Sequence, residues 1–168
     1  VVLSGDSCLL ENLPELEDVR IVEEILTSMD ADISRTPDGS MRIDPSGIST
    51  FSVTGEMVSS MRASYYLLGA LLGRYKKAEI ALPGGCAIGQ RPIDQHIKGM
   101  RALGADIVIQ GGSVKARADR LRGAEIYLDV VSVGATINIM LAAVAAEGQT
   151  IIANAAKEPH VVDVANFL

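Results

Sequence analysis

The sequence predicts a mixed α/β (α+β) domain built from repeated units, and three observations lead to this prediction. The chain carries an internal repeat, its apolar residues fall on helical faces within each copy, and its composition is that of a folded protein. Hydrophobic residues make up 48% of the 168 positions and charged residues 21%, so the chain can bury one sizeable core. The repeat indicates how that core is organised.

The repeat is clearest in two pairs of matching segments. "DADISRTPDGSMRI" (30–43) aligns with "GADIVIQGGSVKA" (104–116), and each contains Ala-Asp-Ile, a turn with Gly-Ser and a second short strand. Both segments are therefore predicted to be β-hairpins. Downstream, 61–82 matches 133–154, and both read as a helix followed by a strand. The unit is strand, helix, strand, strand, helix, with a period of roughly 72 to 74 residues.

A helix is also expected before each hairpin. In both copies the apolar residues recur three or four positions apart, which places them on one face of a helix. These positions are Val19, Val22, Leu26 and Met29 in the first copy and Ile93, Ile97, Met100 and Leu103 in the second.

Both ends of the chain are predicted to be incomplete copies of the unit. Residues 1–14 read as the tail of a helix and its strand, and 158–168 read as the start of a further first helix. We therefore expect one partial barrel domain with units at 7–77 and 78–150 and the start of a third at 151–168. We also expect the chain to be an excerpt from a longer polypeptide, here called the parent.

Composition excludes several classes of function. The net charge of −6, with no basic stripe, argues against a nucleic-acid partner. The start of the chain has no signal-peptide pattern, and the longest apolar run is too short to span a membrane. Cys8 and Cys86 make no disulfide framework, and with His96 and His160 they show no zinc spacing. We expect no metal, no cofactor and a reducing, cytoplasmic location.

The stretch "LPGGCAIGQRPID" (82–94) is the first candidate site. It follows a predicted strand and precedes a helix expected from about Pro92, and backbone N–H groups at such a joint bind anions. The guanidinium of Arg91 suits a phosphate or carboxylate. Cys86 is either an incidental buried thiol in a glycine-rich turn or a reactive thiol on a loop that can move. Composition alone favours the buried thiol.

Two equivalent helix starts are the other candidates. Arg62 begins the helix of the first copy, and its counterpart in the second is Gly134, within "SVGAT". Ser132 is placed to cap that second helix. His96 is interpreted as a surface or packing residue, because nothing in its spacing from Cys86 indicates a Cys–His protease.

In this order, "MRAS" (61–64), the Gly-Gly-Cys loop with its Arg-Pro, "SVGAT" (132–136) and "NAAKEP" (154–159) resemble the UDP-N-acetylglucosamine 1-carboxyvinyltransferase family. These are the enolpyruvyl transferases of peptidoglycan synthesis, and the resemblance covers nearly the whole chain. It implies two domains, each an inside-out α/β barrel of three βαβαββ units, with the substrates between them. The chain would be most of one domain, and the second domain of the same enzyme would be its partner.

The resemblance also implies an activity. The enolpyruvyl group of phosphoenolpyruvate is transferred to the 3-hydroxyl of UDP-N-acetylglucosamine and phosphate is released. This is the first committed step of peptidoglycan (cell wall) synthesis, which serves cell shape and division during the cell cycle. Fosfomycin inhibits the family, and no cofactor takes part. We expect the chain alone to be inactive.

Carried over by motif, Cys86 would be the proton donor, which can also bind phosphoenolpyruvate covalently and carry a pyruvate adduct. Arg91 would contact the phosphate of phosphoenolpyruvate and border the nucleotide-sugar site. Arg62 would lie near the sugar nucleotide. The residues that would line the uridine side are Arg91, Pro92, Ile93, Asp94 and Gln95, and those that would hold the diphosphate are Ser132, Val133 and Gly134. Many relatives have Lys where this chain has Val130, which puts a charge contribution there in doubt.

Two alternatives stay open. A 5-enolpyruvylshikimate-3-phosphate (EPSP) synthase-like transferase shares the barrel and phosphoenolpyruvate but lacks the Gly-Gly-Cys loop. The chain could instead belong to a non-catalytic module that binds nucleotide sugars. Turnover by the full-length parent distinguishes an enzyme from such a module.

Overall fold

The structure is a computed structural model that describes residues 1–53, 55, 61–82 and 93–168. Its helices are α1 (Glu17–Ser28), α3 (Tyr66–Tyr75), α4 (Asp94–Ala102), α5 (Val133–Ala143) and α6 (Pro159–Phe167), with the 3₁₀ helices η1 (Pro45–Gly47) and η2 (Arg62–Tyr65). Its strands are β1 (Cys8–Leu10), β2 (Asp32–Arg35), β3 (Met41–Asp44), β4 (Ser52–Val53), β5 (Lys77–Ala81), β6 (Asp106–Gln110), β7 (Ser113–Arg117), β8 (Glu125–Tyr127) and β9 (Ile151–Ala153).

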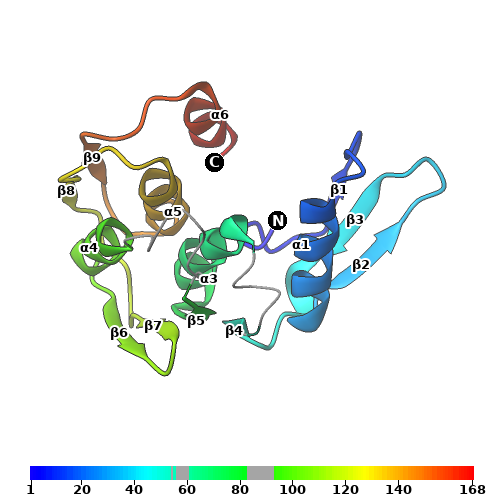
Figure 1. Ribbon diagram of the computed structural model, residues 1–168, viewed down its shortest axis with the longest axis horizontal. Coiled ribbons are helices and arrows are strands. Elements are labelled where there is room, and N and C mark those ends of the chain that lie inside the picture. Colours follow the sequence, from blue (N-terminus) through cyan, green and yellow to red (C-terminus); the bar gives the residue numbers. More distant parts are fainter. Residues whose placement is uncertain (54, 56–60, 83–92) are drawn as a thin grey trace.

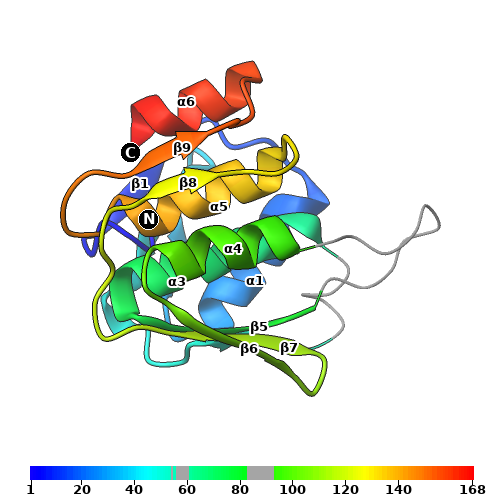
Figure 2. The ribbon, with the colours of Figure 1, turned by 90° about the vertical axis from the view of Figure 1, so that its left-hand side faces the viewer.

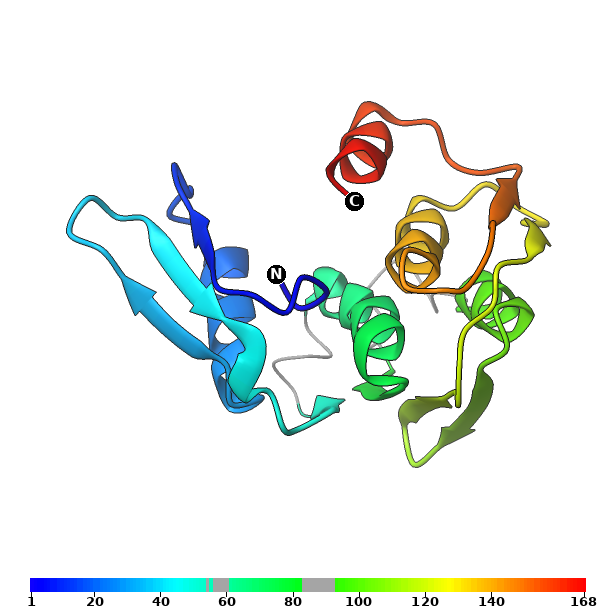
Figure 3. The ribbon, with the colours of Figure 1, turned by 180° about the vertical axis from the view of Figure 1, so that it is seen from behind.

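The strands form three small sheets that lie around the outside, with α3 and α5 between them (Figure 1). The first sheet has the order β1-β3-β2, the second β4-β5-β7-β6, and the third pairs β8 with β9. Seen from behind, the first sheet and α1 lie on one side of α3, the second sheet runs beneath α3, and the third sheet lies on the opposite side (Figure 3). Sheets outside and helices inside give the mixed α/β architecture that the sequence predicts.

Both predicted hairpins are present. Strands β2 and β3 pair antiparallel after α1, and β6 and β7 pair antiparallel after α4. The strand before each helix joins its sheet in the same place, because β1 pairs with β3 and β5 with β7, again antiparallel. The two copies therefore share one strand order, while the unit boundaries at 77/78 and 150/151 stay a prediction.

Two local predictions were wrong or incomplete. Residues 2–4 form a turn, closed by the N–H of Ser4 on the carbonyl of Val1 (3.1 Å), and not the tail of a helix. Strands β4 and β8 were not predicted; they pair parallel with β5 and β9, to which α3 and α5 connect them. With two and three residues, these strands are too short to show an alternating pattern.

The face of α1 also differs from the prediction. Ile25 is 1% exposed, whereas Val22 is 37% exposed. Val22, Ile25 and Leu26 line a largely apolar hollow of about 840 Å³ between the first residues of the chain and α1, α3, α5 and α6. Val22 is on the predicted face, but the hollow leaves it open to solvent. The face of α4 agrees with the prediction, because Ile97, Met100 and Leu103 are buried.

The core is organised by the contact between α3 and α5. A Cβ on Gly69 would clash with the carbonyl and side-chain oxygens of Asn138, and one on Gly73 would lie 2.9 Å from the carbonyl oxygen of Leu141. The two glycines thus let the backbones of the helices approach closely. No helix among the described residues is both long and apolar enough to cross a membrane.

We expect Gly69→Ala to lower the free energy of unfolding by about 1–3 kcal/mol, the range for an overpacked core. The new methyl group meets a backbone carbonyl of Asn138, which cannot turn aside. Chemical denaturation of the chain, alone or within the parent, measures the loss.

Gly99→Ala is the matched control, because the atoms nearest to its methyl group would belong to the Ile139 side chain and not to a backbone carbonyl. Its smaller loss should be partly recovered by adding Ile139→Val, which removes the nearest of these atoms, Cδ1. If the two alanine variants lose the same free energy of unfolding, the α3–α5 contact is not tighter than the α4–α5 contact.

Candidate functional site

The starts of α3, α4 and α5 lie together at one end of the molecule (Figure 2). The ring of Tyr65, which ends η2 just before α3, meets the ring of His96 in α4 edge to face, with centroids 5.1 Å apart. Asn138 of α5 contacts both residues through its amide nitrogen, at 2.9 Å from the carbonyl oxygen of Tyr65 and 3.0 Å from Nδ1 of His96. The motif segments around 62, 94 and 132 therefore meet in space.

The start of α5 has the predicted cap. The hydroxyl of Ser132 accepts a hydrogen bond from the N–H of Ala135 (3.2 Å), and its carbonyl accepts one from Thr136 Oγ1 (2.8 Å). Among the described residues, the N–H groups of Val133 and Gly134 have no partner. Free N–H groups and the helix dipole together favour an anion at this point.

Gln95 joins the start of α4 to the loop before α5. Its amide nitrogen donates to the carboxylates of Asp94 (2.9 Å) and Asp129 (3.2 Å), and its oxygen accepts from the N–H of Asp129 (2.9 Å). Lys98 pairs with the other carboxylate oxygen of Asp129 at 2.6 Å. The hydrogen bonds from Lys98 and then Gln95 lower the pKa of Asp129. Gln95 is 5% exposed, and these contacts hold the two helix starts in register.

His96 was predicted to be a surface or packing residue, and its ring does pack, against Tyr65 and the first turn of α5, which places it at this site. A Cβ on Gly134 would lie 3.3 Å from both Cε1 and Nε2 of the imidazole, so the ring rests against the first turn of α5. Burial lowers the pKa of His96 to about 4, although the negative charge of Asp94 acts in the other direction and raises it. The imidazole is therefore neutral at pH 7. In the sequence, the one feature that relates to this contact is Gly134, which lies two positions after the cap Ser132 and leaves room for the ring.

Tyr65 completes the polar lining of this end. It is 6% exposed, and its hydroxyl has no hydrogen-bond partner among the described residues. Burial raises the pKa of this phenol, which stays protonated.

The structure places some of the predicted site residues and not others. Cys86, Arg91 and Pro92 lie outside the described residues, and so does the side chain of Arg62, whose backbone is in η2. The helix predicted from about Pro92 is described from Asp94. The predicted residues that meet at the helix starts are Ile93, Asp94, Gln95, Ser132, Val133 and Gly134.

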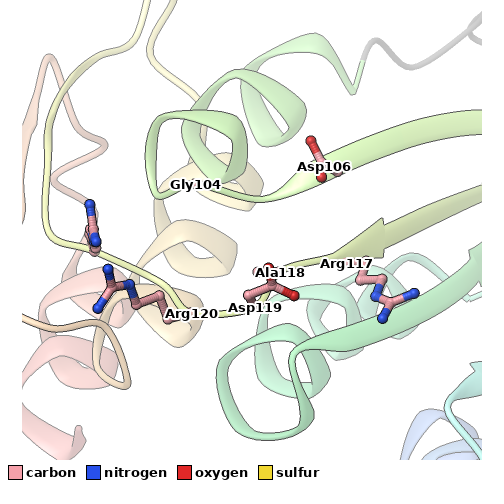
Figure 4. Close-up of a pocket in the computed structure, with 7 residues that line it drawn as sticks. Gly104, Asp106, Arg117, Ala118, Asp119 and Arg120 are labelled. Atoms are coloured by element: carbon pink, nitrogen blue, oxygen red, sulfur yellow. The ribbon is translucent and has the colours of Figure 1, made fainter.

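A second hollow, of about 310 Å³, lies at the other end of α4 (Figure 4). Arg117 and Arg120 extend from it in different directions, and the carboxylates of Asp106 and Asp119 lie at the same place. Arg122 lines the same hollow, but the guanidinium groups of Arg117 and Arg120 do not converge on one ligand. Within the described ranges, no three His, Cys, Asp or Glu side chains are grouped so that they could hold a metal ion.

A family model described as EPSP synthase (3-phosphoshikimate 1-carboxyvinyltransferase) matches residues 2–168. The chain belongs to the EPSP synthase family. The enolpyruvyl transferase NikO from Streptomyces tendae superimposes with a TM-score of 0.81 at 22% identity, covering 98% of this chain and 39% of that one. An EPSP synthase from Acinetobacter baumannii gives 0.71 at 20% identity, over 95% and 38%. The predicted fold class is confirmed.

Curated relatives in this family are much more similar in sequence. The UDP-N-acetylglucosamine 1-carboxyvinyltransferase of Clostridium botulinum is 56% identical over 100% of this chain and 40% of its own length. The protein named UDP-N-acetylglucosamine 1-carboxyvinyltransferase 2 in Bacillus subtilis is 53% identical over 99% and 39%. These matches confirm the resemblance. The chain spans about 40% of the length of these relatives.

We expect His96 to make stability depend on pH. Its pKa is about 4 in the folded state, against 6.5 for an unperturbed imidazole, so the unfolded state takes up a proton first as the pH falls. Stability from this residue is complete above pH 6.5 and is lost between about 6.5 and 4. Between pH 7 and pH 5 the free energy of unfolding should fall by about 2 kcal/mol because of this residue.

Denaturant unfolding of wild type and His96→Gln at both pH values measures this difference. Replacement of the imidazole should remove most of it, whereas His160→Gln, at an exposed position on α6, should leave it in place. An unchanged pH dependence in His96→Gln would show that the imidazole is not held neutral.

Proposed function

We propose that the chain is part of a UDP-N-acetylglucosamine 1-carboxyvinyltransferase, which moves the enolpyruvyl group of phosphoenolpyruvate onto the 3-hydroxyl of UDP-N-acetylglucosamine. The observation that carries the proposal is 56% identity along the whole chain with a relative of that name. The motifs of that family occur in order in this sequence. The solved structures, at 20–22% identity, support the fold alone.

The described residues suit the nucleotide-sugar side of such a site. The free N–H groups of Val133 and Gly134 would receive the diphosphate, because a helix start stabilises negative charge. Ser132 caps the same turn. Ile93 and Asp94 would line the uridine side, and the contacts of Gln95 would keep that segment beside α5.

The chemistry requires a general acid, a role we assign to Cys86. The oxygen of the 3-hydroxyl attacks C2 of phosphoenolpyruvate and gives up its proton to a base, which the second domain would supply, while C3 takes a proton from the general acid. Phosphate then leaves from the tetrahedral ketal as C3 gives up a proton and the double bond forms again. A thiol with an unperturbed pKa of about 8.5 is mostly protonated at neutral pH and can supply the first proton. Arg62 and Arg91 would offset the negative charge of the substrates.

The proposal also defines partners and location. The second domain of the parent would close the cleft and supply the rest of the catalytic groups. Neither nucleic acid nor a membrane is part of the proposal. The reaction would start peptidoglycan synthesis in the cytoplasm, a reducing location that fits a chain whose two cysteines form no disulfide framework.

One alternative has an observation in its favour, because the matching family model carries the name of EPSP synthase. That enzyme would use phosphoenolpyruvate with shikimate 3-phosphate. A non-catalytic nucleotide-sugar-binding module is the alternative of another class, and it would bind UDP-N-acetylglucosamine without turnover.

Phosphate release by the purified parent tests the proposal. We expect release with phosphoenolpyruvate and UDP-N-acetylglucosamine together, and none with either alone. Release with shikimate 3-phosphate would support the first alternative, and binding without release would support the second.

The isolated 168-residue chain should stay at the level of a blank without enzyme. Catalytic groups from both domains must converge, and a misplacement of ~1 Å already costs about 10²-fold in rate. Turnover by the chain alone would refute the dependence on a second domain.

Variants of Cys86 in the parent test its role as the acid. Alanine should abolish turnover, and serine should fail almost as badly, because a hydroxyl is too weak an acid to protonate carbon. Aspartate should retain activity, since partial desolvation raises its pKa, and that activity should decline at a lower pH than in wild type. Steady-state rates across pH measure all three.

Alkylation by the epoxide phosphonate fosfomycin, mapped by mass spectrometry, tests the same thiol. We expect the adduct on Cys86, with Cys8 spared. Cys8 lies between the Ser4 hydroxyl and the Asp6 carbonyl, each at 3.5 Å, in the first segment of the chain. Full activity of Cys86→Ala, or labelling at Cys8 alone, would leave Cys86 as a structural thiol.

A further inference from the structure

Asn138 is a fully buried amide in the middle of α5, and it hydrogen-bonds to both neighbouring helices. Its Oδ1 accepts from the N–H of Gly69 in α3 (2.7 Å). Its Nδ2 lies 2.9 Å from the carbonyl oxygen of Tyr65 and 3.0 Å from Nδ1 of His96 in α4. A residue with 0% exposure that makes three such contacts does more than fill space.

The backbone partners fix which way the amide faces. The N–H of Gly69 can only donate, so it must meet the oxygen of the amide, and the carbonyl of Tyr65 can only accept, so it must meet the nitrogen. The remaining N–H of Asn138 then points at His96. Nδ1 of His96 must therefore be an acceptor without a proton, which leaves the proton of the neutral imidazole on Nε2.

This tautomer directs a donor to the first turn of α5. Nε2 and Cε1 of His96 both lie 3.3 Å from the place where a Cβ on Gly134 would be. The same turn has the N–H groups of Val133 and Gly134, which lack a partner among the described residues. The Nε2–H of His96 is thus a third donor beside two backbone donors, all of them uncharged.

We propose that Asn138 is a positioning residue, which holds His96 as the Nε2–H tautomer so that this N–H faces the anionic group bound at the first turn of α5. The proposal deepens the proposed function and rests on it, because the anion would be the diphosphate of the nucleotide sugar. Within the part of the chain that the structure describes, the ionisable groups beside the imidazole are Asp94 of α4, whose charge favours protonation, and the phenol of Tyr65. Helix α5 itself carries no charged side chain.

Two substitutions of His96 in the parent separate donation from packing. The side-chain amide of glutamine reaches the place of Nε2 and keeps a donor there, whereas asparagine can keep a partner for Asn138 but reaches no further than Nδ1. We expect the KM for UDP-N-acetylglucosamine to rise at least about tenfold more in His96→Asn than in His96→Gln. An equal rise, or a larger one in His96→Gln, would overturn the donor role.

Asn138→Asp tests the positioning role directly. A carboxylate in this place accepts from Nδ1–H, so it favours the other tautomer and turns the donor away from α5. The KM for UDP-N-acetylglucosamine should rise about tenfold while the KM for phosphoenolpyruvate stays within about twofold. Ile139→Ala is the control, because it removes the next side chain on the same helix, which is fully buried and packs toward Gly99 of α4. If this control raises the same KM equally at a matched melting temperature, Asn138 is only structural.

A spectroscopic measurement keeps the inference independent of turnover. With ¹⁵N-labelled histidine in the parent, and His96→Asn to assign the signal, we expect His96 to show a protonated Nε2 and a bare Nδ1 at pH 7. Asn138→Asp should move the proton to Nδ1. A wild-type His96 with the proton on Nδ1 would overturn the inference even in an active enzyme. If the parent does not use UDP-N-acetylglucosamine but the expected tautomer is found, the proposed function fails while the tautomer assignment stands.

Discussion

The close contact between α3 and α5 is the constraint on which the rest of the structure depends. Gly69 and Gly73 allow the two backbones to approach, and Asn138 uses the short distance to hydrogen-bond the N–H of Gly69. An amide that is completely buried costs free energy unless its donors and acceptor are all used. Because its partners lie on both neighbouring helices, Asn138 is satisfied only when α3, α4 and α5 are correctly arranged.

That arrangement brings together the helix starts at which we propose a binding site for an anion. Each first turn leaves backbone N–H groups that its own helix cannot use. Gln95 and Asp129 join two of the starts, and Lys98 neutralises the carboxylate that this joint brings in. The chain has a net charge of −6, so its overall charge does not attract an anion. The helix dipoles and the uncharged N–H donors at these helix starts can attract an anion over a short range.

The sheets follow from the same geometry. Helices α3 and α4 pack on α5 and also contact strands, whereas α5 packs between α3, α4 and α6. The strands are short and lie on the outside (Figure 1). In the hollow beside α1, α3, α5 and α6, apolar side chains lack such cover, and Val22 and Phe167, which line it, are exposed there.

The sequence by itself determined the repeat, both hairpins and the helices before them, because periodicity and turn residues act over a few neighbouring positions. It also determined Ser132 as a cap and the family, which rests on motifs in order. Only the tertiary structure decided that His96 meets Gly134, that Gln95 reaches Asp129 and that Asn138 joins three helices. These contacts link residues 34 to 73 positions apart, and no local pattern encodes which helix faces which. Val22 shows the same limit, since a helical period defines a face but not what covers it.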